Sequence, residues 1–197
     1  MPAMSAVEGA FCRSALWRSF ARRKVLPWAM AGHLLDGDVL EIGGGSGAMA
    51  AGVARMFSDV RLTVTDLDAD MVHAARQRLS AYANITVEAA DVTALPFGNA
   101  SFDAVTSHLM LHHVVAWLEA LAETARVLRP GGIIIGYDLT DTRVGQWVHS
   151  ADGSPHRILA PDELADGLAV AGFTEIAVRP SFAGHLMRFR AHKRTGG

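Results

Sequence analysis

The stretch LEIGGGSGAMA, from Leu40 to Ala50, constrains the fold more than any other part of the chain. A short apolar run meets three consecutive glycines, and a run of small residues with helical character follows. Because glycine has no Cβ, a glycine turn lets the backbone approach a ligand closely. A strand, a glycine turn and a helix in this order predict the first unit of an open α/β sheet with a ligand at the turn.

Strand and helix patterns alternate along the rest of the chain. Apolar and β-branched runs predict strands at residues 38–43, 60–66, 85–91, 102–109, 132–139, 174–180 and 184–193. Helical patterns occur at residues 47–57, 69–83, 117–128 and 159–173. Asp68 is a predicted helix cap, and Pro130 with Gly131 is predicted to end the helix before the fifth strand.

This alternation predicts an α/β fold with a Rossmann-like, doubly wound sheet of seven strands. The sheet is expected to be mostly parallel with a C-terminal antiparallel hairpin, and to carry helices on both faces. The length of 197 residues favours one domain, residues 1–197. Within it we expect a helical lid region at residues 1–36 and the core at residues 37–197.

The amino-terminal segment 11–24 is rich in arginine, and its apolar residues share one helical face. It is either a helix docked on the domain or a helix on a membrane surface, and we favour the docked helix. The chain has no run of about 18 apolar residues, so no membrane span is predicted.

The formal net charge of −2 gives no general drive towards nucleic acid. Cys12 is the single cysteine, which excludes an intrachain disulfide and a cysteine metal cluster and fits a cytoplasmic protein.

Two phosphate-binding patterns compete for the glycine turn. The phosphate loop that ends in Gly-Lys-Ser/Thr is absent, because Ala48 follows Gly47 where a lysine is needed. The dinucleotide pattern G-x-G-x-x-A fits better, with Asp66 at the end of the next strand for a ribose. However, Glu41 places a carboxylate just before the first glycine, where it repels a pyrophosphate and attracts a cation.

The motifs VLEIGGGSG, VTDLDADM and AADVTALPFGNASFDAV occur in this order, followed by LHHV, ARVLRPGG and LAVAGF. This ordered set, from about Asp38 to Lys193, resembles the class I S-adenosylmethionine-dependent methyltransferases, in particular their small-molecule, type 11-like group. The family motif G-x-G-x-G matches Gly43, Gly45 and Gly47. The resemblance implies S-adenosyl-L-methionine as the cofactor and methyl transfer to a small-molecule acceptor by in-line displacement.

The resemblance also implies which residues hold the cofactor: Glu41, Gly43, Gly44, Gly45, Gly47, Asp66, Leu67, Asp91, Val92 and His108. In this assignment Glu41 faces the ammonium group, Asp66 accepts from the ribose hydroxyls and His108 lines the sulfonium region. Leu67 packs on the adenine, while Asp91 and the Val92 backbone bind the adenine edge. Asp66 and Asp91 have a plainer alternative as strand-end and turn residues, and no sequence reason requires glycine at position 44.

Several side chains qualify by position as a general base, which is needed only if the acceptor must lose a proton. These candidates are His108, His112, Tyr137, Asp138 and His149. His108 and His112 are four residues apart, but no nearby acid completes a known metal motif, so no metal is expected.

The acceptor is expected to be a small molecule and not a nucleic acid. No NPPY-like or DPPY-like motif follows the fourth predicted strand, and Cys12 lies outside the core. The amino-terminal helix and the loop Asp141–His156 are expected to form the lid and walls of the acceptor site, with Trp17, Trp28 and Trp147 as apolar surface.

Two alternative functions stay open: a non-catalytic S-adenosylmethionine-binding protein on the same fold, and a nicotinamide-dependent oxidoreductase. The sequence assigns no oligomeric state.

Overall fold

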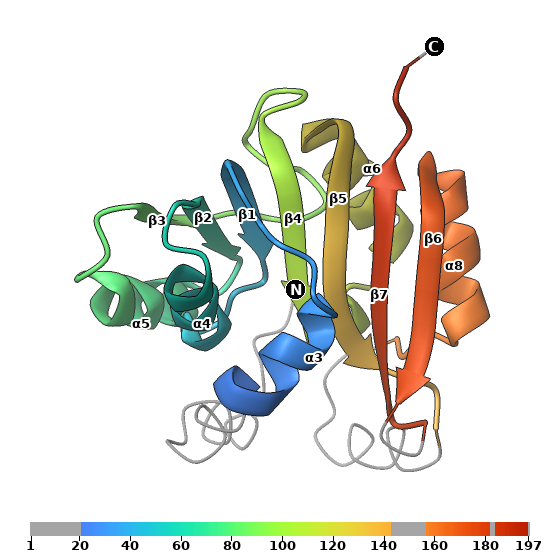
Figure 1. Ribbon diagram of the computed structural model, residues 1–197, viewed down its shortest axis with the longest axis horizontal. Coiled ribbons are helices and arrows are strands. Elements are labelled where there is room, and N and C mark those ends of the chain that lie inside the picture. Colours follow the sequence, from blue (N-terminus) through green and yellow to red (C-terminus); the bar gives the residue numbers. More distant parts are fainter. Residues whose placement is uncertain (1–20, 143–156, 182–183, 197) are drawn as a thin grey trace.

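The computed structural model describes residues 21–142, 157–181 and 184–196. Seven strands form one sheet in this part of the chain: β1 (Asp38–Ile42), β2 (Arg61–Asp66), β3 (Ile85–Ala89), β4 (Phe102–His108), β5 (Leu128–Leu139), β6 (Phe173–Ser181) and β7 (Leu186–Lys193). Their order in the sheet is β3-β2-β1-β4-β5-β7-β6 (Figure 1). Strands β1 to β5 pair in parallel, and β7 is antiparallel to both of its neighbours. The order reverses between β1 and β4, so their carboxyl ends form the point where such sheets bind ligands.

Helices cover both faces of the sheet (Figure 1). One face carries η1 (Ala21–Val25), α3 (Leu26–Met30), α4 (Ala48–Met56) and α5 (Ala69–Leu79), and the other carries α6 (Trp117–Val127) and α8 (Pro161–Val170). Each layer buries its own hydrophobic cluster, one around Val53 and Leu62 and the other around Leu121 and Leu168. This double layer explains why the parallel strands are apolar on both faces.

The predicted fold class is confirmed: the sheet is mostly parallel, its last two strands form an antiparallel hairpin, and helices lie on both faces. Local signals also act as predicted, because the Asp68 carboxylate accepts from the Asp70 and Met71 backbone N–H groups at the start of α5. Several predicted boundaries differ by up to four residues from the observed ones, including the end of α5 and the start of β5. β5 begins at Leu128 and not at residue 132, because Leu128 pairs with Phe102 and its side chain is completely buried.

Parts of the expected lid lie outside the described residues, namely most of the amino-terminal helix 11–24 and the loop from residue 143 to 156, with Trp17, Trp147 and His149. In the described part of residues 1–36, η1 and α3 lie on the sheet, and the Trp28 ring meets Tyr137 of β5 edge-on at 6.1 Å between centroids. Within the described ranges, no helix is long and apolar enough to cross a membrane.

Candidate functional site

The glycine turn lies at the carboxyl ends of β1 and β2, and its glycines have separate reasons to be glycine. Gly43, Gly45 and Gly47 have φ of 61°, 54° and 76°, the left-handed region that disfavours a Cβ. A Cβ at Gly43 would lie 1.9 Å from Cγ of Met110, which belongs to the turn after β4. A Cβ at Gly45 would meet no atom within 4 Å, so this glycine borders open space.

Gly44, at which no sequence pattern requires a glycine, lies directly against β2. A Cβ there would be 2.4 Å from Cγ1 of Val64 and 3.4 Å from Oε1 of Glu41. Its backbone N–H donates to the Thr65 carbonyl at 2.8 Å. The middle glycine therefore brings the turn close to β2 and to the Glu41 carboxylate.

Asp66, at the end of β2, anchors the turn from the side of the neighbouring strand. Its Oδ2 accepts from the Gly45 backbone N–H at 2.8 Å, and its Oδ1 accepts from the Asp68 N–H at 2.9 Å. Burial raises the pKa of the Asp66 carboxyl, and these backbone donors only partly oppose the shift. Each carboxylate oxygen can accept further bonds. Beside it, the Leu67 side chain is 46% exposed although it is large and apolar.

Asp91 and Val92 follow β3, the neighbour of β2. The Ala90 N–H donates to the Asp66 carbonyl at 3.0 Å, which holds this segment next to the end of β2. Asp91 Oδ1 accepts from the Thr93 backbone N–H at 2.9 Å and from its hydroxyl at 2.7 Å. Asp91 thus makes the hydrogen bonds of a turn residue, which is the alternative to a role in adenine binding. Val92 is buried in the core.

A cluster of buried polar side chains lies at the ends of β1 and β4. Glu41 is 1% exposed, and its Oε1 lies 3.7 Å from Nδ1 of His108. The parallel register places Glu41 beside Thr106. Several buried atoms have no hydrogen-bond partner among the described residues: both oxygens of Glu41, both ring nitrogens of His108, and the hydroxyls of Thr106 and Ser107. Buried polar atoms are normally satisfied, so these atoms keep the capacity to bond to the polar groups of a ligand.

A second buried pair joins His112 to Asp138 at the end of β5. His112 belongs to the short turn η2 (Leu111–His113), and its Nδ1 bonds to Oδ1 of Asp138. Asp138 also accepts from the Leu139 N–H at 2.7 Å. Burial alone would raise the pKa of Asp138, but the charge and hydrogen bond of His112 outweigh it and hold that pKa below its ordinary value.

The turn between β4 and η2 brings this pair together. Leu109 has φ of 54°, a left-handed conformation that is strained for a leucine, and its N–H donates to the Tyr137 carbonyl at 2.9 Å. The strain redirects the chain from β4, so that His108 and His112 take different surroundings. The His108 ring lies 5.6 Å from the Tyr137 ring, whereas His112 reaches Asp138.

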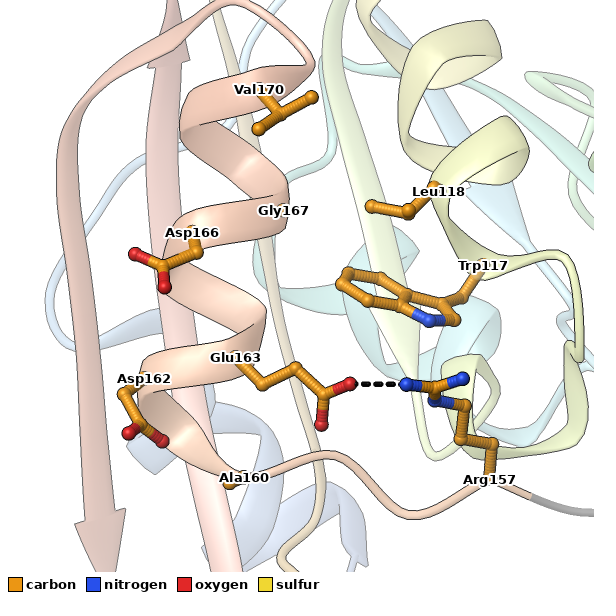
Figure 2. Close-up of a pocket in the computed structure, with 9 residues that line it drawn as sticks. All are labelled: Trp117, Leu118, Arg157, Ala160, Asp162, Glu163, Asp166, Gly167 and Val170. Atoms are coloured by element: carbon orange, nitrogen blue, oxygen red, sulfur yellow. Dashed lines mark hydrogen bonds and ion pairs between the residues drawn. The ribbon is translucent and has the colours of Figure 1, made fainter.

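Arg157, which directly follows residues 143–156, binds to the same turn. Its backbone N–H donates to the His112 carbonyl at 2.7 Å, and its guanidinium forms an ion pair with Glu163 at 2.6 Å. Figure 2 shows this ion pair at one end of a surface groove between α6 and α8, over the Trp117 ring. None of the predicted cofactor residues lines this groove. In the described ranges, no three His, Cys, Asp or Glu side chains are grouped to hold a metal ion.

Comparison with known proteins assigns the family. Residues 40–136 match the family model described as a methyltransferase domain. The chain is 31% identical to the demethylmenaquinone methyltransferase of Clavibacter sepedonicus, over 92% of this chain and 81% of that protein. The chain belongs to the class I S-adenosylmethionine-dependent methyltransferases. The resemblance predicted from the motifs is thus confirmed, and S-adenosylmethionine is the cofactor of this methyltransferase.

Other relatives of the methyltransferase are matched over a smaller share of their own length. It is 33% identical to the malonyl-[acyl-carrier protein] O-methyltransferase of Hahella chejuensis, over 68% of this chain but 50% of that protein. The chain spans about half the length of several such curated relatives, with 56% for a ubiquinone/menaquinone biosynthesis C-methyltransferase of Geotalea daltonii.

Solved structures show the same fold at low identity. A Haloferax volcanii putative methyltransferase, solved with the Trm112 methyltransferase activator, matches with a TM-score of 0.80 at 17% identity, over 98% of this chain and all of that one. A possible histamine N-methyltransferase of Thermotoga maritima matches with a TM-score of 0.77 at 22% identity, over 95% and 96% of the two chains.

The site of the methyltransferase fits its cofactor. The Glu41 oxygens accept no hydrogen bond from the described residues and suit a cationic ammonium group, and the open side of Gly45 leaves room for a ligand against the backbone. Sequence reasoning missed Met110, which packs on the turn, and Arg78, whose guanidinium bonds to Ser46 within it. Of these two residues, only Met110 could have been found from the sequence. It lies just after the end of a predicted strand, and residues in that position lie at the edge of the sheet where ligands bind.

Proposed function

We propose that the methyltransferase holds S-adenosylmethionine across the glycine turn, with the methionine portion beside Glu41 and the ribose beside Asp66. The buried Glu41 carboxylate, which has no hydrogen-bond partner in the described part of the chain, supports the first assignment. The remaining acceptor capacity of the Asp66 carboxylate supports the second. When bound, the cofactor supplies a methyl group on a positively charged sulfur, which is a good leaving group. His108, 3.7 Å from Glu41, then borders the sulfonium region.

The adenine end of the proposed site lies beyond β2 and β3. The exposed Leu67 side chain supplies an apolar surface for the ring, and such a surface is unfavourable when left in water. Asp91 and the Val92 backbone N–H follow β3 on the same edge. We assign them the adenine edge, with one Asp91 oxygen already accepting from Thr93.

The acceptor we propose is a small molecule whose attacking atom becomes nucleophilic when an ionisable oxygen loses its proton. The single observation that carries this proposal is the buried His112–Asp138 pair. A bond from Nδ1–H to Asp138 fixes the neutral tautomer in which Nε2 carries the lone pair. His112 then accepts the acceptor's proton, and Asp138 stabilises the resulting imidazolium. Tyr137 and His108 take the role of pocket wall, and His149 lies outside the described residues.

The names of the relatives agree with this acceptor class. They include demethylmenaquinone, a malonyl group on a carrier protein, and a fatty acid. We propose that residues 1–197 act as one catalytic domain in the cytoplasm, without nucleic acid as a partner. The single cysteine of the chain and its formal net charge of −2 support this assignment.

Labelled methyl transfer tests the acceptor class. The protein is incubated with methyl-labelled S-adenosylmethionine and three groups of acceptors: hydroquinones, carboxylic acids, and amines without an ionisable oxygen. We expect label in a hydroquinone or a carboxylic acid, at a rate that falls as the pH is lowered. Label confined to amines would contradict the proposal. Calorimetric titration with S-adenosylmethionine and a nicotinamide dinucleotide is the parallel control, and only the first is expected to bind.

A Glu41→Gln variant tests the ammonium assignment through two opposite effects. Glutamine removes a buried carboxylate that has no hydrogen-bond partner among the described residues, so the melting temperature of the cofactor-free protein should stay the same or rise. Affinity for S-adenosylmethionine should fall about 10- to 100-fold, because a hydrogen bond to a charged group contributes roughly 1.5–3 kcal/mol. Calorimetry and thermal unfolding measure the two effects.

The matched ligand for this variant is 5′-methylthioadenosine, which lacks the amino-acid portion of the cofactor. Its affinity should be the same for Glu41→Gln and for the unaltered protein. Equal weakening of both ligands would show that Glu41 shapes the whole turn and does not face the ammonium group.

A further inference from the structure

Arg78, in the last turn of α5, reaches across to the glycine turn. Its Nη1 donates to the Ser46 carbonyl and also to the Ser46 hydroxyl, the latter at 2.6 Å. Ser46 is buried, and α5 lies beside α4, which begins directly after the turn (Figure 1). The two residues are 32 positions apart in the chain. The turn is therefore held from outside by a cationic side chain of the neighbouring helix.

Arg78 and Asp66 hold two different points of the same turn. Asp66 accepts from the N–H of Gly45, whereas Arg78 donates to the carbonyl of Ser46. A carboxylate therefore fixes one point and a guanidinium fixes the next. Bonds to charged groups are stronger than neutral ones, which matters in a segment whose glycines have wide conformational freedom.

Among the described residues, no side chain other than that of Arg78 forms a hydrogen bond with the Ser46–Gly47 end of the turn. Gly47 is the amino-terminal cap of α4, and it has φ of 76° and no side chain to bond the first N–H groups of the helix. Its own N–H donates to the Gly44 carbonyl at 3.0 Å. The orientation of the first turn of α4 thus depends on how Ser46 is held.

We infer that Arg78 is a positioning residue for the cofactor. It fixes the Ser46–Gly47 end of the glycine turn, and with it the amino end of α4, against the methionine portion of S-adenosylmethionine. The inference rests on the proposed placement of the cofactor. Asp66 holds the Gly45 end independently, so loss of Arg78 affects the methionine portion and spares the adenosine portion.

Three ligands and an Arg78→Gln variant test this inference by calorimetry. Affinity for S-adenosylmethionine and S-adenosylhomocysteine should fall about tenfold, within the range for loss of hydrogen bonds from a charged group. Affinity for 5′-methylthioadenosine should change less than about threefold. Arg78→Lys keeps a cationic donor and should restore the first two affinities to within about threefold of the unaltered protein.

Two further variants complete the design. Arg76→Gln is the matched control, because Arg76 is exposed on the same helix and its Nε bonds to the Val87 carbonyl, away from the turn. It should leave all three affinities unchanged. Ser46→Ala removes one of the two bonds from Arg78, and it should show the same ligand selectivity with about a threefold loss.

Two results would overturn the inference. Unchanged affinities in Arg78→Gln and Ser46→Ala would show that the turn keeps its shape without Arg78. Equal weakening of all three ligands would show a general loss of the turn, and not the positioning of its Ser46–Gly47 end. If the unaltered protein binds none of the three ligands, the proposed cofactor placement fails, and this outcome is distinct from both.

Discussion

A His112→Asn variant is expected to lose kcat about 10²- to 10⁴-fold, the usual contribution of a general base. Asparagine places an amide N–H near the position of Nδ1, so the bond to Asp138 can be kept. No second nitrogen then remains to accept the proton of the acceptor. Affinity for S-adenosylmethionine should change less than about twofold, because His112 does not belong to the proposed cofactor contacts. Initial rates with the acceptor found by methyl labelling, together with calorimetry, measure both quantities.

The pH profile separates a base from a merely structural histidine. A general base works only when unprotonated, so the rate of the unaltered enzyme should fall as the pH is lowered. The small residual rate of His112→Asn should lack this acidic limb. The control is His113→Asn, since the His113 ring lies 4.0 Å from the His112 ring but Asp138 bonds to His112. A kcat within threefold of the unaltered enzyme in His112→Asn would contradict the assignment.

The fold could be predicted because its signals are local. Alternating strand and helix patterns and the glycine turn depend on neighbouring residues, and so does the Asp68 cap, which acts over three positions. The boundary at Leu128 was wrong for the same reason. Pro130 and Gly131 suggest a break, but pairing of Leu128 with Phe102 extends the strand through them, and pairing across the sheet is not visible in local sequence.

For the candidate site, the sequence predicts which residues lie at the ends of strands, but not which of them contact one another. Glu41, Asp66 and Asp138 each lie at or near the carboxyl end of a parallel strand, where ligands bind. Which of them pair is a matter of geometry. Asp138 meets His112 across 26 residues because β4 and β5 are neighbours and Leu109 turns the chain. The reason for Gly44 likewise appears only when Val64 of β2 is seen against it.

Replacing Asp138 with alanine should lower the free energy of unfolding by about 3–5 kcal/mol at pH 7, the cost of leaving a buried charge partner alone. Asp138 is 1% exposed, and the substitution removes its bonds to His112 and to the Leu139 N–H. Asp138→Asn keeps one acceptor and should cost less, roughly 1–3 kcal/mol. Urea unfolding followed by circular dichroism measures these differences.

The pH dependence of this loss has a defined sign. The pKa of Asp138 in the folded protein is held below its ordinary value of 3.8. Its contribution is therefore fully present above that ordinary value, and it is lost as the pH falls through the lower folded value. The difference between Asp138→Ala and the unaltered protein should therefore shrink as the pH falls below about pH 4.

The control for this prediction is Asp59→Ala, which removes an exposed carboxylate that bonds only to Ser58 among the described residues. It should change the unfolding free energy by less than about 0.5 kcal/mol at any of these pH values. A loss below about 1 kcal/mol for Asp138→Ala at pH 7 would mean that the desolvation of the two side chains cancels their attraction. The pair would then serve catalysis without stabilising the fold, and the His112→Asn variant would be the only test of its role.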